Sequence, residues 1–188
     1  PVTDAAGRIA SWIAGQRGSF APVLGRALDG LPVGSLGVAE ATIPQNPFEL
    51  RADEARNLGA GLGITSEWWL GQYGEPRLVY TDKAFRKGRW LASNRRTIHM
   101  AVDIFAPAGE PVRAPLAGKV ALAENREGHL DYGGVVILEH RTPAGDVFHT
   151  LYGHLAADGA AKLKPGQEIA AGEAFAKLGP AEENGGWE

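Results

Sequence analysis

Hydrophobic residues recur at helical spacing near the start of the chain, at Ala5, Ile9, Trp12 and Ile13. This periodicity predicts a helix over residues 3–16, with Thr3 or Asp4 as its N-cap. A second short helix is expected over residues 22–28, and residues 52–58 are also compatible with a helix. We interpret residues 1–75 as a partly helical lead-in that packs against the segment after it.

From residue 76 onward the pattern changes to short β-rich runs. Six runs predict strands, at residues 77–81, 97–106, 119–124, 135–140, 147–154 and 168–170. Turns separate them at residues 107–109, 143–145 and 164–166. The run Val135-Val136-Ile137-Leu138 is typical of a strand covered on both faces. The prediction is therefore a mainly β fold, a β-sandwich or barrel-sandwich core over residues 77–179 in a domain of residues 76–188. Helices are expected only in the first third.

Composition narrows the possible functions. Gly accounts for 26 of the 188 residues, about twice the usual ~7%, which favours tight turns and short strands. A net charge of -3 gives no basic surface for nucleic acid or an anionic membrane, so neither partner is predicted. Without Cys, any metal must be bound by His, Asp, Glu or carbonyl groups.

The ends of the chain suggest a compartment. There is no apolar run of the ~18 residues that span a bilayer, and the start has no signal-peptide pattern. We therefore expect a cytoplasmic location, with a periplasmic or exported one as the alternative. Because the first residue is Pro, we expect the chain to be a processed or excised piece of a longer protein.

The sharpest chemical pattern is His99-Met100-Ala101-Val102-Asp103. In a strand His99 and Asp103 share one face, and both side chains are suitable zinc ligands. However, four residues of flat strand span ~13 Å, which is too far for both to reach one ion. Either the chain bends between them, or they lie on the solvent-exposed face of an edge strand and share no metal ion.

A second candidate is His154, at the end of a predicted strand in Thr150-Leu151-Tyr152-Gly153-His154-Leu155. A His there can take a proton from a water or orient a polarised carbonyl. The alternative is a surface His whose ring nitrogens are simply hydrogen-bonded. We interpret the remaining histidines as structural or solvated: His129, His140 and His149.

Several ordered motifs together resemble the lysostaphin/LytM family of zinc metallopeptidases. The residues that carry the resemblance are Arg96 to Phe105, Pro107 to Val112, Ala114 to Val120, Tyr132 to His140, Thr150 to Leu155, Lys164 to Ile169 and Ala171 to Glu173. They span about 80 residues in the family's order. The resemblance implies a hydrolase, a zinc endopeptidase that cuts the Gly- or D-amino-acid-containing peptide cross-links of bacterial peptidoglycan.

The resemblance also implies roles for single residues. His99 and Asp103 correspond to zinc ligands and His154 to a catalytic His. The family then requires a His-x-His pair, whose second His completes the metal site. Since no His follows His154 in this sequence, we expect the third protein ligand beyond residue 188, and we expect this chain alone to be metal-poor and inactive.

A narrower resemblance concerns two segments, Gly71 to Tyr80 and Glu183-Asn184-Gly185-Gly186-Trp187. They are similar to a branch in which the peptidase-like module lies between a kinase-like domain and a class III, pyridoxal-phosphate-dependent aminotransferase domain. This implies an alternative function, a non-catalytic scaffold or ligand-binding module of a large cytosolic enzyme.

The expected partners are a peptide substrate, if the domain is active, and the flanking domains. A biotinyl-type carrier is disfavoured because no Lys lies at a hairpin tip between apolar neighbours.

Overall fold

The computed structural model describes residues 4–37, 62–77, 80, 85, 96–128 and 130–184. Internal contacts divide the chain into two compact units. The first unit comprises Pro1–Leu28, Ala108–Glu127 and Tyr132–Asn184, and the second comprises Asp29–Pro107, Gly128–Asp131 and Gly185–Glu188. The predicted domain boundary between residues 75 and 76 stays a prediction.

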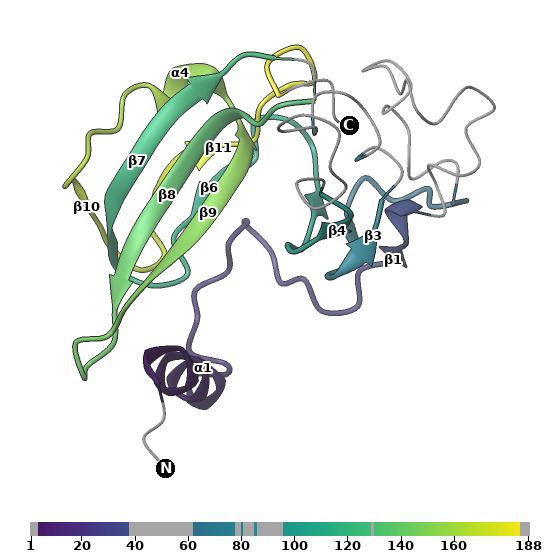
Figure 1. Ribbon diagram of the computed structural model, residues 1–188. Coiled ribbons are helices and arrows are strands. Elements are labelled where there is room, and N and C mark those ends of the chain that lie inside the picture. The colour runs from purple at the N-terminus through teal and green to yellow at the C-terminus, as the bar shows by residue number, and fades with distance from the viewer. Residues whose placement is uncertain are drawn as a thin grey trace, which may run out of the picture. The chain divides into compact units, whose positions relative to one another are not determined.

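The first unit is built on a curved antiparallel sheet of four strands (Figure 1). The order is β10, β7, β8, β9, with bounds Glu168–Ile169, Gly118–Arg126, Gly133–Arg141 and Val147–Leu155. Each strand covers a predicted run, although Ala170 lies outside β10. The mainly β fold is therefore confirmed.

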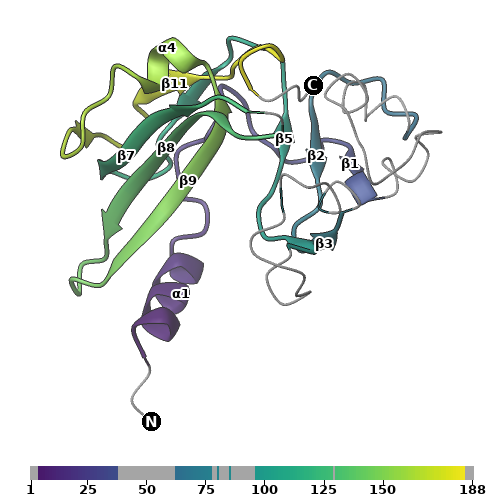
Figure 2. The ribbon, with the colours of Figure 1, turned by 45° about the horizontal axis from the view of Figure 1, so that its top comes forward.

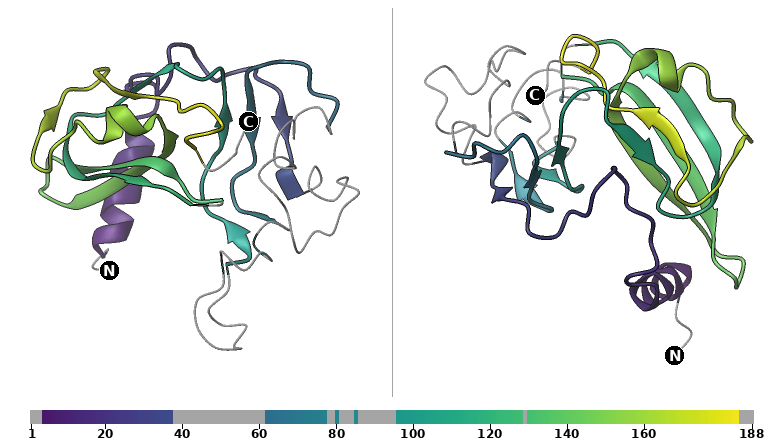
Figure 3. Two further views of the ribbon diagram at one scale, coloured as in Figure 1. Left: turned by 90° about the horizontal axis from the view of Figure 1, so that it is seen from above. Right: turned by 180° about the vertical axis from the view of Figure 1, so that it is seen from behind.

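Strand β8 lies at the centre of this unit's core. Of the continuous apolar run, Val135, Val136 and Leu138 are almost completely buried, as predicted, whereas Ile137 is half-buried. A ribbon of β6 (Pro111–Arg113) and β11 (Ala174–Lys177) lies over one face of the sheet (Figure 3). The short helix α4 (Ala157–Ala160) follows β9 and packs against β7, β8 and β11.

Helix α1 (Ala5–Gly15) confirms the first predicted helix and belongs to the same unit (Figure 2). Asp4 is its N-cap, and its carboxylate accepts a hydrogen bond from the Gly7 amide at 2.8 Å. Arg8 donates to both carboxylate oxygens of Asp146, at 3.0 and 2.6 Å. These contacts hold α1 at the end of the β8–β9 hairpin.

The second unit contains only short strands among its described residues. β1 (Val33–Gly34), β2 (Trp69–Gly71) and β5 (Ile104–Phe105) form one sheet, and β3 (Glu75–Pro76) pairs with β4 (Ile98–His99). Its core holds Leu36 and Trp69, packed against Leu62, Ile64 and Phe105. The Trp69 and Phe105 rings are stacked, with centroids 3.9 Å apart.

Two helix predictions need correction. Helix α4 lies in the last third of the chain, so helices are not confined to the first third; four residues are too few to give a periodic pattern. Residues 22–28 form bends rather than a helix. Their backbone pairs with distant segments instead: the Arg113 amide donates to the Val23 carbonyl at 2.7 Å. Residues 52–58 lie outside the described residues.

The strand predicted over residues 77–81 is also not seen in its described part. Strand β3 ends at Pro76, and the Tyr80 amide donates to the Arg77 carbonyl at 3.3 Å, which is a turn. The other residues of this run lie outside the described part of the chain.

No helix in the described ranges is long and apolar enough to cross a bilayer.

Candidate functional site

Two antiparallel segments of the second unit position His99 and Asp103. Residues 69–76 and 98–105 keep one register, in which Trp69 pairs with Phe105 and Glu75 pairs with His99. The Gly71 amide donates to the Asp103 carbonyl at 2.9 Å, and the Gly74 amide donates to the His99 carbonyl at 2.8 Å. Between these two hydrogen bonds neither segment is paired as a strand, and the backbone bends at Ala101. The bend that a metal ion shared by His99 and Asp103 would require is therefore present.

The bend brings the two side chains together. Nε2 of His99 lies 3.4 Å from Oδ1 of Asp103, well inside the ~8 Å that a shared ion permits. Two ligands each about 2.1 Å from a tetrahedral zinc ion are themselves about 3.4 Å apart. The pair therefore has the spacing of two ligands of one ion.

The hydrogen bonding of His99 agrees with this geometry. Its Nδ1 lies 2.5 Å from the Tyr80 hydroxyl. Its Nε2 is buried and, within the described ranges, forms no hydrogen bond of normal length; it faces Oδ1 of Asp103 at 3.4 Å. A buried polar atom that is bonded only weakly is costly. A metal ion between Nε2 and Asp103 would satisfy it.

Asp103 is held as an anion. Burial acts to raise the pKa of its carboxyl group, but a hydrogen bond from the His99 ring in its Nε2-protonated form and the charge of the Arg77 guanidinium outweigh burial and lower that pKa below its ordinary value. Arg77 donates to Oδ2 and leaves Oδ1 facing His99. An anionic carboxylate with one oxygen available is a suitable zinc ligand.

Arg77 is itself paired with the buried carboxylate of Glu75, at 3.2 Å. Glu75 in turn accepts hydrogen bonds from the Ser35 hydroxyl at 2.9 Å and the Leu36 amide at 3.1 Å. Glu75, Arg77 and Tyr80 were not among the predicted site residues. Each is a single polar residue without a spacing pattern, so no local signal identifies it.

The described residues do not complete a metal site. Within them, no group of three or more His, Cys, Asp or Glu side chains lies close enough to hold an ion. The ligand roles of His99 and Asp103 and the predicted third ligand stay predictions.

His154 lies in the first unit, near the end of β9. Its φ of 59° is in the left-handed region, which costs about 1–3 kcal/mol for a residue other than Gly. Its Nδ1 lies 2.8 Å from the Asn184 carbonyl oxygen. A carbonyl only accepts hydrogen bonds, so Nδ1 carries a proton, and in the neutral ring Nε2 keeps its lone pair. The catalytic role of His154 stays a prediction.

The other histidines have structural or solvated positions. His140 is 2% exposed, and its ring nitrogens are bonded to the Ala117 carbonyl and the Thr150 hydroxyl. The His149 side chain is 50% exposed. Both therefore occupy the positions that we expected for non-catalytic histidines, whereas His129 lies outside the described residues.

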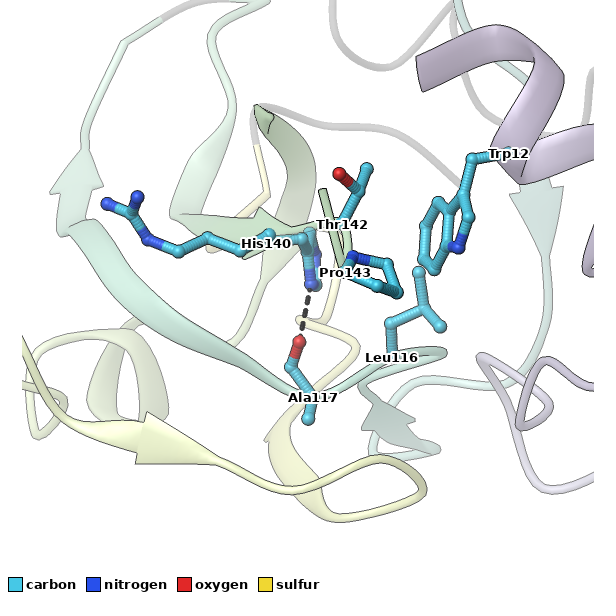
Figure 4. A pocket seen from close by; sticks show the side chains of 7 residues that line it. Trp12, Leu116, Ala117, His140, Thr142 and Pro143 are labelled. Atoms are coloured by element: carbon cyan, nitrogen blue, oxygen red, sulfur yellow. Dashed lines mark hydrogen bonds between the residues drawn. The ribbon is translucent and has the colours of Figure 1, made fainter. Parts of the chain in front are cut away.

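His140 also borders a cavity of about 290 Å³ at the end of the sheet (Figure 4). The lining residues are Trp12, Leu116, Ala117, His140, Arg141, Thr142 and Pro143. The lining combines apolar side chains with a histidine whose two ring nitrogens are already bonded. It contains no pair of carboxylate and imidazole like that of the second unit.

Comparison with known proteins adds a family match. Residues 97–187 match the family described as peptidase family M23. A similar solved structure is Csd3 of Helicobacter pylori, with 23% identity and a TM-score of 0.38 over 59% of this chain. The match covers 26% of Csd3, so this chain corresponds to about a quarter of that protein. No curated protein matches this chain.

Proposed function

Because residues 97–187 are a LytM-type domain of peptidase family M23, we propose that this domain is a zinc metallopeptidase that hydrolyses peptide bonds of the cell-wall cross-link kind. The observation that carries the proposal is the 3.4 Å separation of His99 Nε2 and Asp103 Oδ1. Both atoms can donate a lone pair to the same ion, and neither needs to move far to do so.

Zinc, when bound, supplies Lewis acidity that polarises the peptide carbonyl and activates a water. The residues of the chain provide the rest of the proposed chemistry. His99 and Asp103 would hold the ion, and His154 would accept a proton of the attacking water at Nε2, because the Asn184 carbonyl keeps the proton of the neutral ring on Nδ1. A third protein ligand, which we expect after residue 188, completes the coordination.

Cleavage of purified peptidoglycan, and of short Gly- and D-Ala-containing peptides, tests this function. Cleavage can be followed by the release of new amino groups and by mass spectrometry, with zinc present. A longer chain that continues past Glu188 is expected to cleave, whereas this chain alone is expected to cleave poorly. The substitutions His99→Ala and Asp103→Ala should abolish cleavage. His149→Ala, which removes a half-exposed histidine, should leave it unchanged.

The alternative function is a non-catalytic scaffold or ligand-binding module. The ion pair of Asp103 with Arg77 favours it, because a guanidinium can satisfy the carboxylate without any metal. If neither chain length binds zinc or cleaves any of these peptides, the peptidase proposal is wrong and the scaffold is preferred.

A further inference from the structure

The contacts around His99 and Asp103 come from residues that precede the family match. Glu75, Arg77 and Tyr80 lie before residue 97, where that match begins. We infer that these three are positioning residues, which fix the tautomer of His99 and the free oxygen of Asp103 for one metal ion. The inference rests on the proposed metal site and extends it to a segment that no family match assigns.

Tyr80 acts on His99. Its hydroxyl lies 2.5 Å from Nδ1, whereas Nε2 faces Asp103. A histidine can bind a metal through Nε2 only if that atom is unprotonated, which requires the proton on Nδ1. The Tyr80 oxygen can accept this Nδ1 proton, and it therefore favours the tautomer that binds metal. Metal-binding histidines commonly donate their second N–H to such a partner.

Arg77 acts on Asp103. Its guanidinium donates to Oδ2, so the carboxylate is oriented with Oδ1 toward His99. Alone, this cation would also repel a metal ion a few ångströms away. Arg77 therefore restricts the carboxylate to one free oxygen, but it needs a compensating charge.

Glu75 supplies that charge. Its carboxylate is buried beside Arg77 and is fixed by the Ser35 hydroxyl and the Leu36 amide. Two carboxylates and one guanidinium leave one net negative charge, the same as Asp103 alone. The site therefore gains an oriented ligand without losing its attraction for a cation. In this way Glu75, Arg77 and Tyr80, which precede the family match, contribute to the metal site.

The first experiment substitutes Tyr80→Phe in the 188-residue chain and uses Tyr73→Phe, an exposed tyrosine of the same unit, as the matched control. Nitrogen-15 NMR of the metal-free protein reports which ring nitrogen of His99 carries the proton. Calorimetry with zinc alone, on the longer chain that continues past Glu188 and carries the same substitution, reports affinity, and thermal unfolding reports folding. Tyr80→Phe should lower the fraction of the Nδ1–H tautomer and weaken zinc binding by about 10–100-fold. Tyr73→Phe should change neither.

The second experiment substitutes Glu75→Gln, which keeps an acceptor oxygen but removes the charge. Glu67→Gln, at an exposed residue of the same unit, removes the same charge as a control. Glu75→Gln should weaken zinc binding by about tenfold or more and should leave the His99 tautomer unchanged. Glu67→Gln should have little effect.

The outcomes separate this inference from the proposed function. An unchanged His99 tautomer in a folded Tyr80→Phe protein overturns the role of Tyr80, whether or not zinc binds. Equal zinc affinity in Glu75→Gln and Glu67→Gln overturns the role of Glu75. No zinc uptake by the longer chain contradicts the proposed function instead, and the tautomer measurement then still decides whether Tyr80 positions His99.

Discussion

His140 offers a sharp test of the division between structural and functional histidines. Its imidazole is buried, with Nδ1 2.9 Å from the Ala117 carbonyl oxygen and Nε2 2.8 Å from the Thr150 hydroxyl. The ring also stacks on Phe148, with centroids 5.1 Å apart. Substitution His140→Leu keeps a similar volume but removes both hydrogen bonds.

The expected loss of stability follows from the groups left behind. A buried polar group that loses its partner costs about 1–3 kcal/mol. The Ala117 carbonyl loses its bond to the ring, whereas the Thr150 hydroxyl keeps a second bond, to the Tyr152 hydroxyl at 3.0 Å. We therefore expect His140→Leu to lower the free energy of unfolding by about 1–3 kcal/mol. Zinc affinity should stay within about twofold, since His140 binds no ion.

Urea unfolding followed by circular dichroism measures the first quantity, and calorimetry with zinc measures the second. His149→Leu is the control, because that side chain is half exposed, so its unfolding free energy should change by no more than about 0.5 kcal/mol. The reasoning fails if His140→Leu destabilises by less than about 1 kcal/mol. It also fails if the variant remains folded and stable but loses zinc binding, since His140 would then belong to the metal site.

Two further predictions concern other contacts. Substitution Gly71→Ala places a Cβ 3.1 Å from Oδ2 of Asp103, so the carboxylate must shift by a few tenths of an ångström. Metal–ligand distances tolerate only about 0.2 Å, so zinc affinity measured by calorimetry should fall by about tenfold. The hydrogen bond from Arg8 lowers the pKa of Asp146 in the folded state, so this stabilisation is present above the unfolded pKa and is lost as pH falls through the lowered folded pKa. Thermal unfolding should therefore show Asp146→Asn less stable than the wild type at neutral pH and equal to it in strong acid, and a difference that persists in acid would contradict this assignment.

The sequence predicted the long elements of the first unit well. β7, β8 and β9 each have nine residues and a β-rich run, which is enough for a clear local pattern. The strands β1, β2, β6 and β11 have two to four residues, and their pairing depends on distant segments. Residues 22–28 were misassigned for the same reason, because the Val23 carbonyl accepts from the Arg113 amide and the Gly25 amide donates to the Glu110 carboxylate.

The candidate site was predictable only in part. The spacing of His99 and Asp103 showed that the chain must bend if the two residues share an ion, and the structure has that bend, with the atoms 3.4 Å apart. Arg77 and Tyr80 could not be found in this way. Their roles arise from a pairing of residues 69–77 with residues 97–105, which no local pattern encodes.

The bent segment has the reverse of the usual arrangement of polar and apolar side chains. Met100 and Val102 are 67% and 53% exposed, whereas the side chains of His99 and Asp103 are only 20% and 22% exposed. An isolated strand would gain by turning its apolar residues inward. The observed arrangement is stable only if the buried polar atoms have partners. Tyr80 and Arg77 contact Nδ1 and Oδ2, whereas Nε2 and Oδ1 face each other at 3.4 Å, and these are the two atoms that we assign to zinc.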